Sequence, residues 1–383
     1  MVSRVIVSTV GTSLLTNQID RNREAEKTWY SLLRESANLR DSEITDEKVR
    51  QIIRDLRQRA SQKLQKVDVK TVRRLSAELN GICGIYHDNL TQGKQDTHIL
   101  VATDTEQGKV TAEVVQNYLV DQGITNVSVY IPTGLSTANT TVFTEGIDEL
   151  ITWFKQTLSG HRQQKSRIYF NLVGGFKSLQ GYLNTIGMFY ADEIVYIFEG
   201  AGSELITIPR LPIKVDTDAL RNYVKALAML DVGAALSKAE VKGIPEAMLA
   251  EVDGMYTIST WGNLIWEECK EEFLSGDLPD FSCFDYQASF KRDYQNISQA
   301  KEKIKLQETL AKVAWLLKAS NGSTQSLTET GLKYSPYKGV SGIDHFRVDG
   351  DLRVSCQKAD GRLILRYYGT HDRVQGAELQ KKS

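Results

Sequence analysis

The chain has 383 residues and a formal net charge of −1, with 41% hydrophobic and 25% charged residues. This length exceeds one ordinary hydrophobic core, and this composition is typical of a folded globular protein, which excludes disordered and fibrous classes. The charges are unevenly distributed along the chain. Residues 216–280 have a net charge of −8, and residues 281–383 have a net charge of +6. A basic C-terminal segment after an acidic one favours an anionic partner for the last segment, with ordinary variation as the alternative.

Cysteine spacing and hydrophobic runs indicate the cellular compartment that the sequence predicts. The four cysteines show no CxxC or Cys/His ligand spacing, so neither a zinc site nor a disulfide framework is expected. The first apolar run is too short for a signal peptide, and no run of 18 apolar residues would span a membrane. The sequence therefore predicts a cytoplasmic protein with no membrane partner and no bound metal.

Strand-like and helix-like segments alternate in the first half of the chain. The expected strands are four buried parallel runs and a closing pair: residues 4–10, 98–103, 126–132, 167–173, 193–200 and 204–209. The expected helices between them are residues 109–123, 141–158 and 177–192, and residues 22–80 have the charge and period of a helical insertion after the first strand. This alternation predicts a doubly wound α/β sheet.

The loops after the first four strands are rich in Gly, Ser, Thr and Asn. They read "VGTSLLTN" (10–17), "TDTEQGK" (103–109), "PTGLSTANT" (132–140) and "VGGFKS" (173–178). In doubly wound sheets ligands bind beyond the carboxyl ends of the strands, at helix N-termini. Lys177 at a helix start fits a bound phosphate, or it is simply a solvent-facing lysine after a Gly-Gly turn. No GxGxxG or GxxxxGK[ST] motif is present, which disfavours a dinucleotide cofactor or a Walker-type ATPase.

The first loop and the segment "NLVGGFKSLQGYLNTIGMFYADEIVYIFEG" (171–200) resemble the CARF domain, the CRISPR-associated Rossmann fold, over about residues 1–212. The resemblance implies a homodimeric sensor of cyclic oligoadenylate, with cyclic tetra-adenylate the expected activator and no other cofactor. The phosphate-contacting positions of the family fall on Thr12, Ser13 and Lys177, and some relatives cleave the ring slowly with such residues. Together with the loops, the candidate ligand-binding residues are Gly11, Thr12, Ser13, Thr103, Thr133, Gly134, Gly174, Gly175 and Lys177.

Residues 213–280 have the pattern of a helical connector or dimerisation region. Residues 217–250 show helical spacing of apolar residues, an amphipathic helix is expected within 254–276, and "GDLPD" (276–280) is typical of a linker. We expect the apolar side chains here to form core or dimer contacts rather than a catalytic site.

The pattern restarts at Phe281. Residues 298–319 predict a long helix, and three alternating segments predict an antiparallel meander at 344–348, 352–358 and 362–368. On the third strand, alternation would place Tyr367 in one apolar row with Leu363 and Leu365. The last module is therefore expected to have an α+β fold.

Period two also places His345 and Arg347 on one face, with Arg353 on the neighbouring strand and His371 just past the third. An imidazole transfers protons near neutral pH, and arginine binds phosphate oxygens bidentately. This face predicts metal-free RNA cleavage by attack of the 2′-OH. A basic edge that binds RNA or forms a dimer without catalysis stays open.

The segment "YKGVSGIDHFRVDGDLRVSCQKADGRLILRYYGTHDRV" (337–374) resembles RelE/ParE-type toxins, and the resemblance covers about residues 281–375. It implies an mRNA interferase, often acting on the ribosome and leaving a 2′,3′-cyclic phosphate; ParE relatives instead poison gyrase. The nuclease positions of RelE toxins fall on His345, Arg347, Arg353 and either His371 or Arg373. The late catalytic tyrosine of some RelE toxins has no match, because Tyr367 and Tyr368 come too early.

Arg366-x4-His371 also fits the R-x4–6-H motif of HEPN ribonucleases, but that motif lies on helices and "LILRYYGTH" alternates like a strand. The whole sequence therefore resembles a CARF–RelE fusion: a Rossmann-like α/β sensor, a helical connector and a small α+β domain with an antiparallel sheet. The implied function is a cyclic-oligoadenylate-activated ribonuclease of type III CRISPR antiviral defence. Two alternatives remain, a regulator that binds nucleic acid or protein without cleaving, and a ring nuclease that degrades its activator.

Overall fold

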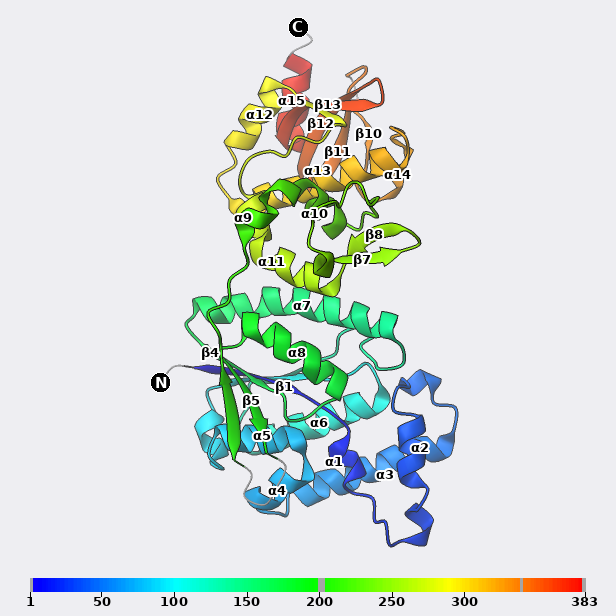
Figure 1. Ribbon diagram of the computed structural model, residues 1–383, viewed down its shortest axis with the longest axis vertical. Helices are drawn as coiled ribbons and strands as arrows, with labels where there is room; N and C mark the ends of the chain where they lie inside the picture. The colour runs from blue at the N-terminus through cyan, green and yellow to red at the C-terminus, as the bar shows by residue number, and fades with distance from the viewer. Residues whose placement is uncertain (1–2, 199–203, 338–339, 381–383) are drawn as a thin grey trace. The chain divides into compact units, whose positions relative to one another are not determined.

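The computed structural model describes residues 3–198, 204–337 and 340–380. The chain divides into two compact units, Met1–Lys214 and Val215–Ser383 (Figure 1). The segment 213–280, expected to be a separate connector, lies almost wholly in the second unit and shares its hydrophobic core. None of the described helices is long and apolar enough to cross a membrane.

In the part of the chain that is described, a six-stranded sheet forms the centre of the first unit. The strand order is β3-β2-β1-β4-β5-β6, and neighbours are parallel except for the antiparallel β5–β6 pair. The strands are β1 (Arg4–Thr9), β2 (Thr97–Val101), β3 (Val127–Tyr130), β4 (Arg167–Asn171), β5 (Glu193–Ile197) and β6 (Leu205–Pro209). The central strands β1 and β2 are almost wholly buried, as apolar runs between two layers of helices must be. The predicted Rossmann-like sheet with its closing pair is confirmed.

Helices cover both faces of this sheet. The described helices of this unit are α1 (Ser13–Thr16), α2 (Trp29–Glu35), α3 (Glu47–Leu64), α4 (Val69–Leu75), α5 (Ala77–Ile85), α6 (Glu106–Asp121), α7 (Thr140–Gln163) and α8 (Lys177–Tyr190). Figure 1 shows α7 and α8 on one face and α5 and α6 on the other. The insertion predicted at 22–80 is helical, because Asp46, Asp68 and Ser76 cap α3, α4 and α5 through their side-chain oxygens.

The strand order reverses its direction between β1 and β4. The loops that follow these two strands meet there, since a Cβ built on Gly11 would lie 2.9 Å from the backbone nitrogen of Gly175. Gly175 has a φ of +92°, which favours glycine. A crevice at such a switch point is the usual ligand site of doubly wound sheets.

A five-stranded sheet is the centre of the second unit, within its described residues. The order is β10-β11-β12-β13-β9, antiparallel except for the parallel β13–β9 pair. The strands are β9 (Phe284–Tyr286), β10 (Ser335–Pro336), β11 (Asp344–Asp349), β12 (Leu352–Ala359) and β13 (Arg362–Thr370), and a separate hairpin consists of β7 (Leu249–Val252) and β8 (Met255–Ile258). The predicted meander is confirmed to within two residues at each end.

The helices of the second unit are α9 (Thr217–Leu220), α10 (Val224–Asp231), α11 (Thr260–Leu274), α12 (Ala288–Gln295), α13 (Ala300–Ala319), α14 (Gln325–Glu329) and α15 (His371–Gln380). One face of the sheet is buried in a core to which Phe346 of β11, Trp266 of α11 and Leu310 of α13 all belong. Helix α15, which the sequence analysis did not predict, packs against β12 and β13. The described part of the second unit therefore has a core face and a face bordered by α15.

Candidate functional site

The candidate residues on β11 and β12 lie side by side. The strand register places Arg347 opposite Arg353 and His345 opposite Ser355. Because Phe346, between the first two, is wholly buried in the core, His345 and Arg347 point to the other face. The structure thus forms the shared face that alternation predicted for His345, Arg347 and Arg353.

A β-bulge changes the same face on β13. Ser355 pairs with Tyr367, but the next residue of β12 pairs with Leu365, so Arg366 is an extra residue in β13. The bulge turns Tyr367 onto the face of Ser355. The expectation that Tyr367 shares a row with Leu365 is therefore wrong, because strict alternation ends at the bulge.

Three aromatic rings gather on this face, and we call them the ring cluster: Tyr337, His345 and His371. Tyr337 stacks on His345 with ring centroids 4.1 Å apart, and the two histidine rings are 6.0 Å apart. His371 is the first residue of α15, and its backbone nitrogen donates to the carbonyl oxygen of Asp351 at 3.0 Å. Sequence analysis missed Tyr337, because a residue outside the periodic strands gives no signal of the face it will join.

Arg347 and Arg353 are neighbours without a carboxylate partner among the described residues. Arg353 is 9% exposed and donates from Nη1 to the carbonyl oxygens of Gly350 and Leu352, each at 2.9 Å. The Nε of Arg347 is buried and has no hydrogen-bond partner in the described residues. Burial and the charge of Arg347 lower the pKa of Arg353. The charge of Asp351 acts on Arg353 in the opposite direction. Two adjacent cations that form no ion pair are unfavourable on their own and suit a bound anion.

The two histidines have unlike surroundings. Burial lowers the pKa of His345, the charges of His371 and Arg353 act in the same direction, and the backbone of Ser335 opposes them. His345 is therefore neutral at pH 7 and can accept a proton. The side chain of His371 is 38% exposed, and its Nδ1 lies 3.2 Å from a carboxylate oxygen of Asp372. Two neighbouring imidazoles can serve as acid and base in general acid–base catalysis.

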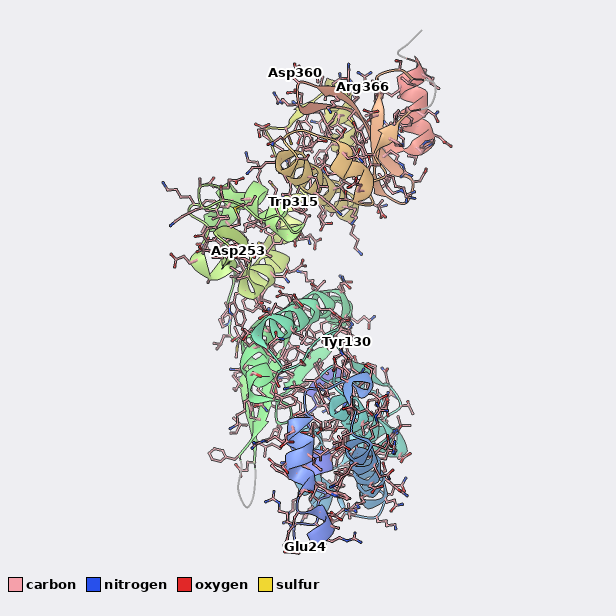
Figure 2. All side chains as sticks on the ribbon, turned by 90° about the vertical axis from the view of Figure 1, so that its right-hand side faces the viewer. Glu24, Tyr130, Asp253, Trp315, Asp360 and Arg366 are labelled. Carbon is pink, nitrogen blue, oxygen red and sulfur yellow. The ribbon has the colours of Figure 1, made fainter. Side chains whose placement is uncertain are left out.

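Two arginines near this face are engaged elsewhere. Arg373, a predicted catalytic residue, pairs with Asp293 of α12 and donates to the carbonyl oxygen of Tyr368. Arg366, labelled in Figure 2, donates to both carboxylate oxygens of Glu378 at 2.8–3.0 Å. Arg373 therefore holds α15 in place and is not brought to the ring cluster. Since Arg366 lies in a strand, the helical HEPN arrangement is not formed.

In the first unit, a buried carboxylate lies between the two loops of the switch point. Glu78 of α5 is wholly buried, and its Oε1 accepts a hydrogen bond of 2.5 Å from the backbone nitrogen of Gly11. A Cβ built on Gly174 would lie 2.5 Å from the same carboxylate. The amide of Gly11, predicted to face a ligand, is thus occupied by Glu78, and both glycines serve close packing around it.

A pocket of about 450 Å³ opens beside these loops. Its lining residues are Ser13, Asn17, Arg73, Arg74, Ala77, Asn80, Leu172, Val173, Gln180, Tyr196, Ile197 and Phe198. The Oγ of Ser13 is buried and has no hydrogen-bond partner among the described residues. Arg74 is exposed and has no ion-pair partner there either, whereas Arg73 pairs with Asp88. Sequence analysis missed both arginines, because they come from the insertion and reach the strand ends only through folding.

The remaining predicted ligand residues do not line this pocket. Thr103 is buried with its hydroxyl 3.0 Å from that of Thr105, and the backbone nitrogens of Thr133 and Gly134 donate to carboxylates. These groups stabilise the loops after β2 and β3. Thr12 precedes α1 without a side-chain capping bond, Lys177 is exposed at the first position of α8, and Gly175 serves the contact between the two loops.

Residues 73–211 match the family model described as CRISPR-associated protein (Cas_APE2256). The match indicates a CRISPR-associated protein. It covers less than half of the chain and includes α5, α8 and most of the pocket lining, while the loop with Ser13 precedes it. The second unit lies outside the matched residues, so the match does not test the predicted resemblance to RelE toxins.

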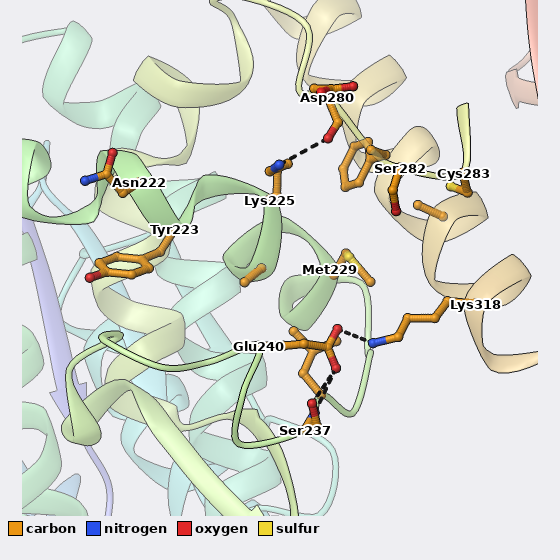
Figure 3. A pocket seen from close by; sticks show the side chains of 14 residues that line it. Asn222, Tyr223, Lys225, Met229, Ser237, Glu240, Asp280, Ser282, Cys283 and Lys318 are labelled. Carbon is orange, nitrogen blue, oxygen red and sulfur yellow. Dashed lines mark hydrogen bonds and ion pairs between the residues drawn. The ribbon is translucent and has the colours of Figure 1, made fainter. Parts of the chain in front are cut away.

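The second unit has a pocket of its own, of about 680 Å³ (Figure 3). Figure 3 shows Lys225 directed to Asp280 and Glu240 bonded to both Ser237 and Lys318. Glu240 and Lys318 neutralise each other, while Lys225 donates to the backbone carbonyl oxygen of Asp280. Among the described residues, no group of three or more His, Cys, Asp or Glu side chains is arranged to hold a metal ion.

Proposed function

We propose that this CRISPR-associated protein is a cyclic-oligoadenylate-activated endoribonuclease of type III antiviral defence that cleaves mRNA, free or on the ribosome. The observation that supports this proposal most directly is the neighbouring pair Arg347 and Arg353, which has no ion-pair partner among the described residues and lies beside two histidines. Cleavage of a phosphodiester requires both cations, which bind the phosphate oxygens, and groups that transfer protons. A lone binding surface would need no pair of imidazoles in unlike environments.

The proposed reaction follows from these groups. His345, neutral at pH 7, takes the proton of the 2′-OH as the O2′–P bond forms. His371 donates a proton to the 5′-oxygen as the P–O5′ bond breaks, which leaves a 2′,3′-cyclic phosphate. Arg347 and Arg353 bind the non-bridging oxygens, where charge accumulates in the transition state. One side chain thus accepts a proton, a second donates one and the two arginines supply the positive charge, so the reaction as proposed uses no metal ion.

The proposed activator site is the pocket at the switch point of the first unit. Its unpartnered Ser13 hydroxyl and the cation of Arg74, which has no ion-pair partner among the described residues, suit a phosphate group. Asn80 Oδ1 already accepts from Arg73 Nε, and Gln180 Nε2 donates to the carbonyl oxygen of Gly174. The other amide atom of Asn80 and of Gln180 suits a nucleobase edge. We propose that two chains bind one ring of adenylates as a homodimer, as the CARF resemblance implies.

The central experiment incubates the purified full-length protein with labelled mRNA or with translating ribosomes, with and without cyclic tetra-adenylate or hexa-adenylate. We expect cleavage only when a ring is present, with fragments ending in 2′,3′-cyclic phosphate. A His345→Ala variant is the control for a contaminating nuclease. Absence of ligand-dependent cleavage in both substrates contradicts the proposal.

Arg74→Ala is expected to weaken binding of cyclic tetra-adenylate by about 10- to 100-fold, because a charge-assisted hydrogen bond to phosphate contributes roughly 1.5–3 kcal/mol. Folding should be unaffected, since Arg74 is exposed and has no ion-pair partner in the described residues. Calorimetry with the labelled ring measures the affinity. Arg54→Ala is the matched control, because Arg54 is an exposed arginine of the same insertion that pairs with Glu47. Equal affinity of Arg74→Ala and wild type would place the ring elsewhere.

A further inference from the structure

Tyr337 is the member of the ring cluster to which the proposed reaction gives no task. Its side chain is 4% exposed, and its ring belongs to a small apolar cluster with Val340, Ile343 and Val374. The hydroxyl at the other end of the ring is buried and has no hydrogen-bond partner among the described residues. A buried hydroxyl without a partner is unfavourable, so its position needs a reason beyond packing.

The hydroxyl is one of several unpartnered polar atoms on the same face. The Nδ1 of His345 and the Nε of Arg347 are also buried without a hydrogen-bond partner in the described part of the chain. Tyr337 stacks on His345, and His345 shares its face with Arg347 and Arg353, so the Tyr337 ring lies on the face of the two arginines. Three unsatisfied polar groups on one face, one of them on Arg347 itself, indicate a polar ligand that forms hydrogen bonds with all three.

We propose that the Tyr337 hydroxyl donates a hydrogen bond to a non-bridging oxygen of the phosphoryl group held by Arg347 and Arg353. Tyr337 would then be a catalytic residue, and this inference rests on the proposed function. Burial raises the pKa of Tyr337 to about 12, so the hydroxyl keeps its proton at neutral pH and acts as a donor. A neutral donor stabilises the transition-state charge without repelling the neighbouring cations.

A purely steric role for Tyr337 is the competing explanation. Its ring stacks on His345 at 4.1 Å with an angle of 25° between the planes, and this contact alone would orient the imidazole. Tyr337→Phe keeps the ring and removes only the hydroxyl, whereas Tyr337→Ala removes both. Comparing these two variants separates the roles.

Tyr334→Phe is the matched control, because Tyr334 lies three positions away but its hydroxyl has a partner, Asp344 Oδ2 at 2.7 Å. Two measurements are needed: single-turnover cleavage of labelled mRNA with cyclic tetra-adenylate present, and calorimetric binding of the same RNA with 2′-O-methyl groups, which cannot be cleaved. We expect Tyr337→Phe to slow cleavage by about 10- to 100-fold and to weaken binding of the methylated RNA several-fold. Tyr334→Phe should change neither.

The outcomes are distinct. Wild-type cleavage and binding in Tyr337→Phe, with loss only in Tyr337→Ala, would overturn the proposal in favour of the steric role. A fall in the thermal stability of Tyr337→Phe would also overturn it, because the hydroxyl would then have a partner within the protein. If the wild type cleaves no RNA, the proposed function fails, but weaker binding of methylated RNA to Tyr337→Phe would still support the phosphate contact.

Discussion

Arg347→Ala is expected to slow ring-activated RNA cleavage by roughly 10²- to 10³-fold while the second unit stays folded. Arg347 lies opposite Arg353, and its Nε is unpartnered among the described residues, so the substitution removes a ligand for phosphate without breaking an internal contact. Single-turnover cleavage at saturating cyclic tetra-adenylate measures the effect. Arg353→Ala is less informative, because Arg353 also bonds the carbonyl oxygens of Gly350 and Leu352 in the turn between β11 and β12.

Arg362→Ala is the matched control for this loss. Arg362 belongs to the same sheet, but it is half exposed and pairs with Asp285 at 2.8 Å. Its removal should leave the cleavage rate within about twofold of wild type, as is usual for an exposed ion pair. If Arg347→Ala lowers RNA affinity modestly and leaves turnover unchanged, the second unit is a binding module and the nuclease proposal is wrong.

Glu378→Ala is expected to destabilise the second unit by about 3–5 kcal/mol, the usual cost of leaving one partner of a buried ion pair behind. The side chain of Glu378 is 1% exposed and that of Arg366 is 12% exposed. The same carboxylate accepts a hydrogen bond of 2.8 Å from the hydroxyl of Ser355, so its loss leaves two buried donors unsatisfied. Hydrogen exchange of the β12 and β13 amides, measured in increasing urea, reports the free energy of unfolding of this sheet.

Asp285→Ala tests whether burial of the ion pair causes the large loss of stability expected for Glu378→Ala. The substitution breaks the ion pair with Arg362. In this pair the side chain of Arg362 is 45% exposed and that of Asp285 is 52% exposed. We expect a loss below about 1 kcal/mol, because water screens such a pair. Similar losses in Asp285→Ala and Glu378→Ala would mean that the buried pair contributes no more than the exposed one.

Much of the fold follows from local pattern. The six strands of the first sheet and the meander of the second are short apolar or alternating runs, and such periods identify strands without knowledge of their neighbours. Helix α15 was not predicted, because "HDRVQGAELQ" has no apolar stripe. It is held instead by Val374 in a small apolar cluster and by ion pairs of Arg373 and Glu378 with distant residues.

In the candidate sites, too, some features follow from local sequence pattern and others from contacts between distant residues. The sequence by itself placed His345, Arg347 and Arg353 on one face, because side chains of a strand alternate whatever surrounds it. Sequence analysis also expected His371 at this face, and the folded chain places its ring 6.0 Å from that of His345. Only the tertiary structure brought Tyr337 to that face, paired Arg373 with Asp293, and placed Arg74 of the insertion in the same pocket as Ser13. Contacts between residues far apart in the chain, and the bulge that turns Tyr367, have no periodic signature, so they become visible only when the chain is folded.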